Sequence, residues 1–461
     1  MNRRDFIKTL SGGALLTGAA MVGCSDQQPR TGDSESAAHG DIPTDQMTYR
    51  TAKRGERVSL LGYGCMRWPT ITGKSAREDA NDIDQEQVNR LIDYALEHGV
   101  NYFDTSPAYC KGFSERATGI ALHRHPRDSY YVATKLSNFA PETWSHQESV
   151  NMYHRSMEYL QVDYIDFYLL HSLGNGADPL KTFHDRYVDN GMLDFLLKER
   201  EAGRIRNLGF SYHGDLDFFE YLLSLDDKYH WDFVQPQHNY VDYRHAKDVN
   251  RRNSNSLNLL EALTQHDIPA IIMEPLLGGR LAELNDYSTR LLKQREPEHS
   301  IASWAMRFSA NDPIVLTTLS GMTYMEHLQD NLRSFTPFQP LTNDELELLE
   351  KVAVNYVSFP IVPCTACQYC MPCPYGLDIP TIFGHYNKSL NRGDIITDQA
   401  DPNYLSAKRH FLIDYNRRVP RERQADHCIN CEQCKPHCPQ HIDIPRQLNR
   451  IDLIVERLKR Q

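Results

Sequence analysis

Eight short apolar runs alternate with longer amphipathic stretches along most of the chain. The runs span residues 58–62, 101–104, 130–134, 164–170, 205–210, 233–237, 270–273 and 314–318. The stretches between them have helical periodicity, as in 85–98, where Val88, Leu91, Ile92 and Ala95 share one face. Alternation of this kind implies parallel strands joined by crossover helices, and eight repeats predict a closed (β/α)8 barrel of the TIM type, an α/β fold.

The chain changes character after residue 341, where cysteine-rich runs replace the strand–helix pattern. Residues 364–374 read CTACQYCMPCP and residues 428–439 read CINCEQCKPHCP, so eight of the 11 cysteines lie in these two runs. Each run is followed by Asp-Ile-Pro, which marks the two as an internal repeat. The cysteines are Cys364, Cys367, Cys370, Cys373, Cys428, Cys431, Cys434 and Cys438.

These cysteines could bind zinc, form disulfides or hold iron–sulfur clusters, and their spacing favours one of the three. The ligands of a zinc site normally come as two pairs that are distant in the sequence. Several cysteines only three positions apart are poorly placed to form several disulfide bonds. The second run has the C-x2-C-x2-C-x3-C-P spacing of bacterial ferredoxins. Eight thiolates match two sets of four, so two [4Fe–4S] clusters are the favoured reading, with zinc and disulfides as alternatives.

The tail also resembles the helical two-cluster ferredoxins of respiratory dehydrogenases, because helical patches (379–391 and 404–417) separate the runs. In such ferredoxins the fourth cysteine of each run binds the other cluster. The resemblance therefore implies a first cluster set, Cys364, Cys367, Cys370 and Cys438. It implies a second cluster set, Cys373, Cys428, Cys431 and Cys434. The first run is one residue shorter than the ferredoxin spacing before Cys373.

Four reactive side chains follow or close the apolar runs of the predicted barrel. Asp104 and Tyr109 lie in NYFDTSPAY, Lys135 closes YYVATK, and His171 closes YIDFYLLH. Active sites of this fold lie at the C-terminal ends of the strands, so an acid, a phenol, an amine and an imidazole are expected to converge there. An ammonium beside a phenol lowers the phenol pKa from about 10 and makes it a better acid.

The same segments resemble the aldo/keto reductase family over most of residues 58–341. The resemblance rests on GYGCMRWP, NYFDTSPAY, ATKL, YLLHS, LGFSYH and FVQPQHNY, in the order of the family. It implies an oxidoreductase that interconverts a small-molecule carbonyl and alcohol by hydride transfer with a nicotinamide cofactor. Tyr109 would be the general acid and base, with Lys135 and Asp104 supporting it and His171 orienting the carbonyl.

The resemblance also implies contacts to the cofactor. Ser211 and Gln235 would meet the nicotinamide amide, Met273 would face its ring and Asn331 would reach the adenine. The cations that bind the 2′-phosphate in NADP-preferring members are absent, since Gly321 and His327 stand there, so both NAD and NADP are open. The turn at 278–280 (Gly-Gly-Arg) is either a pyrophosphate wrap or a plain turn.

The start of the chain has the features of an export signal. Arg3-Arg4 precedes a short apolar run, and residues 1–24 resemble a twin-arginine signal. Cys24 follows Met-Val-Gly, an imperfect lipobox, so it is a candidate for lipidation and membrane anchoring. Residues 25–47 are polar and predict a disordered linker. We therefore expect an exported protein, either periplasmic or a membrane-anchored lipoprotein.

The predicted domains are thus a barrel at 48–341 and a helical [4Fe–4S] ferredoxin-type domain at 342–461. A formal charge of −11 argues against nucleic-acid binding. We expect the clusters to relay electrons between the barrel and a redox partner protein or a quinone. The alternatives are an ordinary aldo/keto reductase with structural clusters, and an electron-transfer protein with a non-catalytic barrel.

Overall fold

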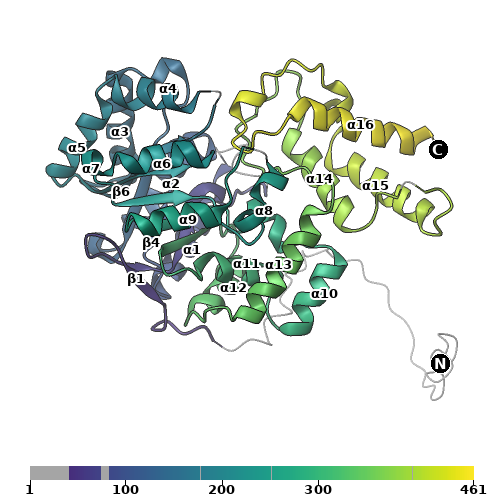
Figure 1. Cartoon of the computed structure of the whole chain (residues 1–461), viewed down its shortest axis with the longest axis horizontal. Helices are drawn as coiled ribbons and strands as arrows, with labels where there is room; N and C mark the ends of the chain where they lie inside the picture. Colours follow the sequence, from purple (N-terminus) through teal and green to yellow (C-terminus); the bar gives the residue numbers. More distant parts are fainter. Residues whose placement is uncertain (1–40, 74–81, 177, 251, 397, 461) are drawn as a thin grey trace, which may run out of the picture. The chain divides into compact units, whose positions relative to one another are not determined.

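Eight parallel strands close into the predicted barrel in a computed structural model, which describes residues 41–73, 82–176, 178–250, 252–396 and 398–460 (Figure 1). Around the barrel the order is β10-β3-β4-β5-β6-β7-β8-β9, so each strand pairs with its successor and the last closes on the first. The strands are Leu61–Gly64 (β3), Tyr102–Asp104 (β4), Tyr131–Leu136 (β5), Ile165–Leu173 (β6), Ile205–Tyr212 (β7), Phe233–Pro236 (β8), Ala270–Ile272 (β9) and Val315–Ser320 (β10).

The first apolar run is divided between two elements, unlike the single strand predicted at 58–62. Arg57–Ser59 (β2) pairs antiparallel with Tyr49–Thr51 (β1), and the first barrel strand is β3. The chain bends at Leu60, between β2 and β3, and the hydroxyl of Ser59 donates to the carbonyl of Leu61 at 2.7 Å. The β1–β2 ribbon places Ala52 and Val58 against the interior side chains of the barrel, so it contributes to the barrel core.

The barrel is surrounded by helices whose apolar faces cover the strands. In Gln85–Glu97 (α1), the side chain of Asp84 accepts from the backbone of Gln87 at the start, and Leu91 and Ile92 are buried. The other barrel helices are Ser114–Leu122 (α2), His146–Leu160 (α3), Pro179–Phe183 (α4), Met192–Glu201 (α5), Leu216–Ser224 (α6), Asp226–Tyr229 (α7), Asp242–Val249 (α8), Ser256–Gln265 (α9), Asp286–Arg295 (α10), Ile301–Ala310 (α11) and Met325–Phe335 (α12).

In the described part of the chain, four α-helices follow the barrel: Asn343–Val357 (α13), Ile379–Asn391 (α14), Tyr404–Arg418 (α15) and Ile444–Arg460 (α16). The helices predicted at 379–391 and 404–417 are both present, as α14 and α15. The repeated Asp-Ile-Pro has a structural role, because Asp378 caps α14 and Pro380 lies in its first turn. In the second copy Asp443 directly precedes α16 and Pro445 lies in its first turn, so each cysteine run leads directly into a helix.

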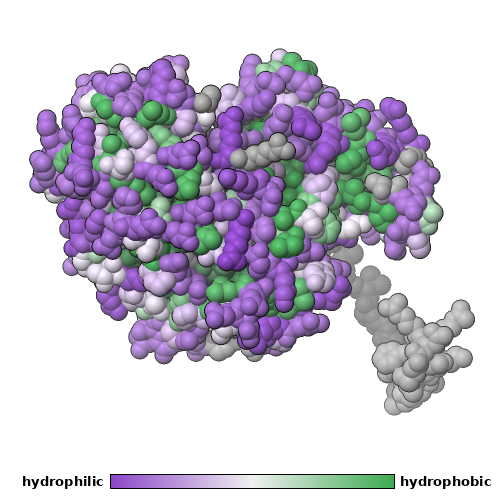
Figure 2. Space-filling model, in the orientation of Figure 1, coloured by the Kyte–Doolittle hydropathy of each residue, from purple (hydrophilic) through white to green (hydrophobic). Residues whose placement is uncertain are grey.

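The helices α14, α15 and α16 pack together around a core of their own, separate from the barrel cores. The surface of this part carries apolar side chains, which Figure 2 shows in green around α14 and α15. Leu405 and Ile413 of α15 are 74% and 56% exposed. By contrast, α13 packs its apolar face against the barrel, alongside Leu277 and Trp304.

The cysteine runs lie against the ends of the barrel strands, within one compact unit that spans residues 42–461. Arg67, which follows β3, donates to the carbonyl of Thr365 at 3.0 Å. Gln440 donates through its side-chain amide to that of Gln237 at 3.1 Å. Lys388 of α14 pairs with Glu283 at 2.9 Å. The two parts of this unit are therefore joined by contacts from both cysteine runs.

The predicted signal at 1–24 and most of the predicted linker at 25–47 lie outside the described residues. Lipidation of Cys24, export and the domain boundaries therefore stay predictions. Within the described part of the chain, no helix has the length and apolar character needed to cross a membrane.

Candidate active site and iron–sulfur sites

Asp104 and Lys135 form a buried ion pair where the neighbouring strands β4 and β5 end. The ammonium of Lys135 donates to Asp104 Oδ1 at 2.5 Å and to the carbonyl of Thr105 at 2.8 Å. Both side chains are almost completely buried. Burial lowers the pKa of Lys135 from its usual value, and the carboxylate of Asp104 opposes that shift. The pair therefore places a fixed cation inside the barrel mouth.

Tyr109 starts a tight turn, Tyr109–Gly112, that follows β4. Cys110 and Lys111 adopt positive φ angles of 48° and 52°, so the chain turns sharply there. The ammonium of Lys135 lies 4.8 Å from the centre of the Tyr109 ring. The ring of Tyr109 contacts that of His171 edge-on, with centres 5.9 Å apart. The phenol, the amine and the imidazole thus converge as the sequence predicts.

His171 is held as a neutral imidazole. Burial, together with the positive charges of Lys135 and Arg186, lowers its pKa well below 6.5. Its Nδ1 is hydrogen-bonded to the hydroxyl of Ser137 at 2.6 Å. Arg186 donates to the carbonyl of His171 at 2.9 Å. A neutral ring fixed in this way is suited to hydrogen-bonding a carbonyl oxygen.

The predicted nicotinamide contacts lie at the ends of neighbouring strands beside the ion pair. Ser211 of β7 and Gln235 of β8 are paired in register, and the amide of Gln235 donates to Asp104 Oδ2 at 3.1 Å. A hydroxyl and an amide side by side fit the carboxamide of a nicotinamide. Met273 follows β9 and is partly exposed. Asn331 lies farther along, in α12, and donates to Ser320 at 2.8 Å.

The glycine turn after β9 packs against the first cysteine run. Gly278 has a φ of +70°, and a Cβ placed on it would lie 2.4 Å from the carbonyl oxygen of Thr365. The glycine is therefore required by the close approach of Thr365 as well as by its backbone angle. Gly279 has a φ of +98° with nothing within 4 Å of a Cβ. The turn is thus a contact between the barrel and the cluster-binding part.

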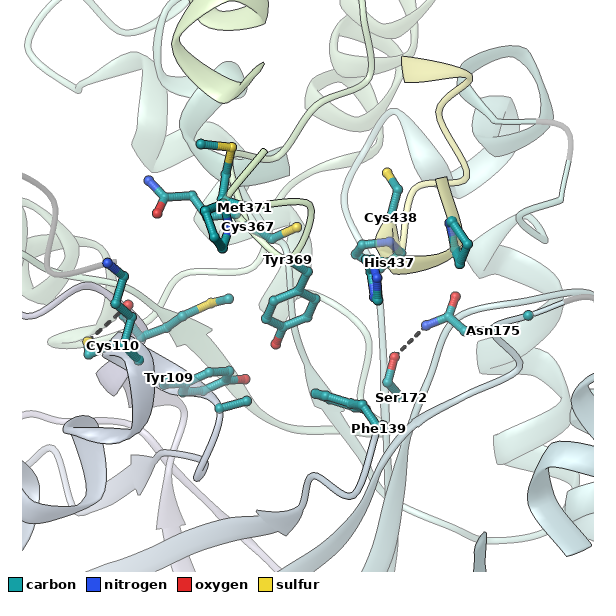
Figure 3. A pocket seen from close by; sticks show the side chains of 18 of the residues that line it. Tyr109, Cys110, Phe139, Ser172, Asn175, Cys367, Tyr369, Met371, His437 and Cys438 are labelled. Carbon is teal, nitrogen blue, oxygen red and sulfur yellow. Dashed lines mark hydrogen bonds between the residues drawn. The ribbon is translucent and has the colours of Figure 1, made fainter. Parts of the chain in front are cut away.

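A cavity of about 690 Å³ opens above Tyr109. The barrel contributes Tyr109, Phe139 and Ser172 to its wall, and the two cysteine runs contribute Cys367, Tyr369 and Cys438. Figure 3 shows Tyr109, Phe139 and Tyr369 pointing into one space, with Cys367 and Cys438 on its other side. The volume is typical of a small-molecule site. The predicted catalytic tyrosine and two predicted cluster ligands therefore share one cavity.

The eight cysteines are grouped as the ferredoxin resemblance implies. One cavity is lined by all four members of the first cluster set. A second cavity, of about 260 Å³, is lined by all four members of the second cluster set and also by Cys370 of the first. Cys438 thus joins the first run, and Cys373 joins the second despite the shorter spacing before it.

The donor atoms fit iron–sulfur clusters. Burial raises the pKa of Cys364 to about 12 and that of Cys438 to about 11, so their thiolates need a compensating cation such as iron. Within the described residues no group of three or more His, Cys, Asp or Glu converges as a single metal ion requires. Cys428, Cys431 and Cys434 form no disulfide in the described chain.

Two buried polar atoms at the first cluster set support this fit. Thr365 Oγ1 and Arg280 Nη2 are buried and have no hydrogen-bond partner within the described residues. Thr365 lines the first cavity, and the charge of Arg280 opposes the upward shift of the Cys364 pKa. Both atoms can donate to cluster sulfur.

Several cavity residues were not predicted from the sequence, among them Phe139, Arg186 and Tyr369. Phe139 lies four residues beyond Lys135, in the loop after β5, and is 39% exposed. Tyr369 lies between Cys367 and Cys370, so the sequence did show that an aromatic side chain belongs to the loop of the first cluster site. The sequence contained no sign that this loop faces the barrel.

Comparisons with known proteins agree with both parts. Residues 60–354 match the aldo/keto reductase family, and residues 363–443 match a 4Fe-4S dicluster domain. L-galactose dehydrogenase from Arabidopsis thaliana is 27% identical over 316 residues, covering 65% of this chain and 91% of the relative. D-arabinose 1-dehydrogenase from Saccharomyces cerevisiae is 37% identical over 89 residues, covering 18% of this chain and 26% of the relative.

Solved structures agree on the fold. An aldo-keto reductase from Bacillus halodurans, in its holo form, has a TM-score of 0.52 at 22% identity, covering 66% of this chain and 96% of the other. A reductase from Klebsiella pneumoniae in complex with NADPH has a TM-score of 0.51 at 21% identity, covering 67% of this chain and 96% of the other. At these identities the likeness supports the fold alone.

The predicted enzyme class and the two [4Fe–4S] clusters are confirmed by these matches, while the roles of individual site residues stay predictions. The family match covers more than half of the chain. The chain therefore belongs to the aldo/keto reductase family and carries a [4Fe–4S] dicluster domain after its barrel.

Proposed function

We propose that this oxidoreductase interconverts an alcohol and a carbonyl by hydride transfer with NAD or NADP, and that its two clusters relay the electrons. The observation that carries the proposal is the shared cavity, which is lined by Tyr109 of the barrel and by Cys367 and Cys438 of the first cluster set. A purely structural cluster would not need to face the catalytic tyrosine.

The residues of the barrel account for the proton transfer. When bound, the nicotinamide accepts or donates the hydride. Reduction leaves an alkoxide, to which Tyr109 donates its phenolic proton, and oxidation reverses this step. The ammonium of Lys135, 4.8 Å from the ring centre, stabilises the phenolate that remains. Asp104 holds that ammonium in place, and neutral His171 is suited to donate a hydrogen bond to the carbonyl oxygen.

The positions of the two cluster sites support one direction for the proposed relay. Reoxidation of one reduced nicotinamide releases two electrons and one proton, so two clusters that each carry one electron when bound would together take the electron pair, and the proton would pass to solvent. The first cluster set borders the substrate cavity, whereas Cys431 of the second set is exposed. Electrons would therefore pass from the barrel through the first site to the second, and then to a redox partner protein or a quinone at the surface.

The substrate is proposed to be rich in hydroxyl groups, as a sugar is. The cavity combines aromatic faces, Tyr109 and Phe139, with polar side chains such as Asn175, Asp378 and Arg423. Aromatic faces that stack on a ring and polar groups that bind hydroxyls are a suitable lining for a carbohydrate. The names of the relatives L-galactose dehydrogenase and D-arabinose 1-dehydrogenase favour the same class.

Export of the loaded protein is proposed from Arg3-Arg4 and the apolar run that follows. The twin-arginine route carries folded proteins, so clusters and a bound nicotinamide would travel with the chain, and Cys24 would anchor it to the membrane if lipidated. Replacing both arginines by lysine should keep the chain in the cytoplasm on cell fractionation. Unchanged export of that variant would refute the signal.

The catalytic proposal is tested with anaerobically purified protein. The full chain is assayed with L-galactose, D-arabinose and lactose, with NAD or NADP, by following reduced nicotinamide. Tyr109→Phe should lower kcat by about 100-fold or more, because the general acid and base is lost. Tyr287→Phe, at a tyrosine that is 52% exposed and outside the cavity, is the matched control. Turnover by Tyr109→Phe equal to that of the control would refute the role of Tyr109.

A further inference from the structure

We infer that Tyr369, carried by the loop of the first cluster site, is a substrate-positioning residue of the barrel's active site. This inference rests on the proposed function and adds a residue that lies outside the barrel. Tyr369 contributes to the same cavity wall as Tyr109. Figure 3 shows its ring entering the cavity, with the hydroxyl directed toward Tyr109 and Phe139.

A continuous set of ring contacts connects Tyr369 to the catalytic residues. The ring centres of Tyr369 and Phe139 are 5.8 Å apart, and those of Phe139 and His171 are 4.9 Å apart. The set ends with the edge-on contact between His171 and Tyr109 at 5.9 Å. The guanidinium of Arg186 lies 5.5 Å from the Phe139 ring centre. Tyr369 therefore extends an aromatic wall that begins at the catalytic tyrosine.

The cluster loop fixes where this ring lies. Tyr369 is placed between Cys367 and Cys370, both members of the first cluster set. The preceding residues Ala366 and Gln368 have positive φ angles of 52° and 62°, so the loop makes tight turns on either side of Cys367. Because Cys367 and Cys370, on either side of the Gln368–Tyr369 pair, are proposed ligands, the cluster would hold the ring over the cavity.

The surroundings of Tyr369 match the needs of a hydroxyl-rich substrate. Its ring offers an apolar face, and its phenol offers one donor and an acceptor. Ser172 and Asn175 line the same cavity, and so do Arg423 and Asp378 from the cluster-binding part. A sugar ring between Tyr109 and Tyr369 would have its reacting carbon near the first and a hydroxyl near the second.

The inference is tested by binding, which does not require turnover. Calorimetry of L-galactose binding and steady-state kinetics are compared for the wild type, Tyr369→Phe, Tyr369→Ala and Tyr375→Ala. Tyr375 is the matched control, because it also lies beside a cysteine run but is 45% exposed and outside this cavity. Iron content and the EPR spectrum of the reduced protein establish that each variant keeps both clusters.

We expect Tyr369→Ala to raise both Kd and KM by about tenfold, through loss of the ring and the hydrogen bond, and Tyr369→Phe by about threefold. The kcat value should change less than KM, since Tyr369 does not transfer the proton. Addition of L-galactose should also perturb the EPR signal of the first cluster in the wild type and less so in Tyr369→Phe.

Unchanged Kd and KM in Tyr369→Ala, with iron content as in the wild type, would overturn the inference. If Tyr369→Ala loses iron, the test passes to Tyr369→Phe: unchanged Kd and KM, with the same EPR response to L-galactose as the wild type, would overturn the inference. Failure of the proposed function has a different signature, because it would appear as full turnover in Tyr109→Phe. If Tyr109→Phe loses turnover while Tyr369→Ala binds L-galactose as the wild type does, Tyr109 keeps its catalytic role and Tyr369 has no role in binding.

Discussion

The two cluster sites have the same ligand chemistry but different surroundings. The first cluster set borders the substrate cavity, and Cys438 within it is only 8% exposed. In the second cluster set Cys431 is exposed, and Ile429, which follows Cys428, is 58% exposed. Thr365 and Arg280 offer buried, unpartnered polar atoms to the first site, as judged within the described residues. The first site therefore borders the proposed substrate cavity, and the second has a ligand at the surface, where the proposed redox partner would bind.

The difference indicates how a barrel enzyme can be connected to electron transfer. The repeat alone provides two similar cysteine runs. Docking against the barrel then makes the sites unequal, because one of them covers the catalytic cavity. The reduction potential of the cluster, its exposure to solvent and the effect on activity of losing one cysteine ligand should all differ between the two sites.

Removal of one ligand from each site should separate them most strongly. Cys438→Ser alters the cavity wall as well as the first site, so kcat/KM for the sugar should fall by about 100-fold. Cys431→Ser should keep sugar-dependent nicotinamide reduction within about threefold but lose electron transfer to an external one-electron acceptor. Steady-state assays with nicotinamide and with ferricyanide check this. Equal losses in the two variants would contradict the proposed order of the sites.

Alkaline pH should inactivate the barrel without affecting the second site. Burial lowers the pKa of Lys135, so the ammonium loses its proton below the usual lysine value of 10.5. As pH rises through that lowered pKa, the charge beside Tyr109 disappears, and kcat should fall by up to about 100-fold. The pH profile of kcat is compared with the EPR signal of the second cluster, which should stay constant. A kcat that holds up to pH 10.5 would show that Lys135 does not support Tyr109.

The contact between the barrel and the first cysteine run is tested by two adjacent glycines. Gly278→Ala meets the Thr365 carbonyl and also strains a positive φ, whereas Gly279→Ala only strains a positive φ. Strain of this kind costs about 1–3 kcal/mol, so both variants should be destabilised, and Gly278→Ala by roughly 1–3 kcal/mol more. Thermal unfolding of the loaded protein gives the difference. Identical melting temperatures would mean that Thr365 does not press on this turn.

The smallest expected effect is on the potential of the first cluster. Arg280→Gln removes a cation that stabilises the more negative reduced form, so that potential should fall by tens of millivolts, with about 59 mV per tenfold change. The second cluster should be unaffected. Arg417→Gln, at a residue 70% exposed, is the matched control. An EPR-monitored redox titration resolves the two potentials, and a shift of the second alone would reverse the assignment of Arg280.

Patterns local in sequence predicted much of this molecule. The apolar runs predicted seven of the barrel strands to within a few residues. The ends of those strands predicted where Asp104, Lys135 and His171 lie. The spacing of cysteines, with the ferredoxin resemblance, gave the two sets, including the exchange of Cys373 and Cys438. The β1–β2 ribbon was missed because the run at 58–62 continues through Ser59 without a turn signal.

The cavity roof could not be predicted, because it depends on docking between distant segments. Tyr369 meets Phe139 across more than 200 residues of chain, and no periodicity records such a contact. The same holds for Gly278, whose sequence suits either a phosphate loop or a plain turn. Its actual neighbour, Thr365, belongs to the other part of the molecule.

In the proposed function, the barrel and the clusters form one redox unit joined at the cavity. Freeze-quench EPR of anaerobic protein, loaded with clusters and nicotinamide and mixed with L-galactose, tests it directly. We predict a signal of reduced clusters that forms within the time of one turnover in the wild type and is absent in Tyr109→Phe. Formation of reduced nicotinamide while the clusters stay oxidised would contradict the relay and leave the clusters a structural role.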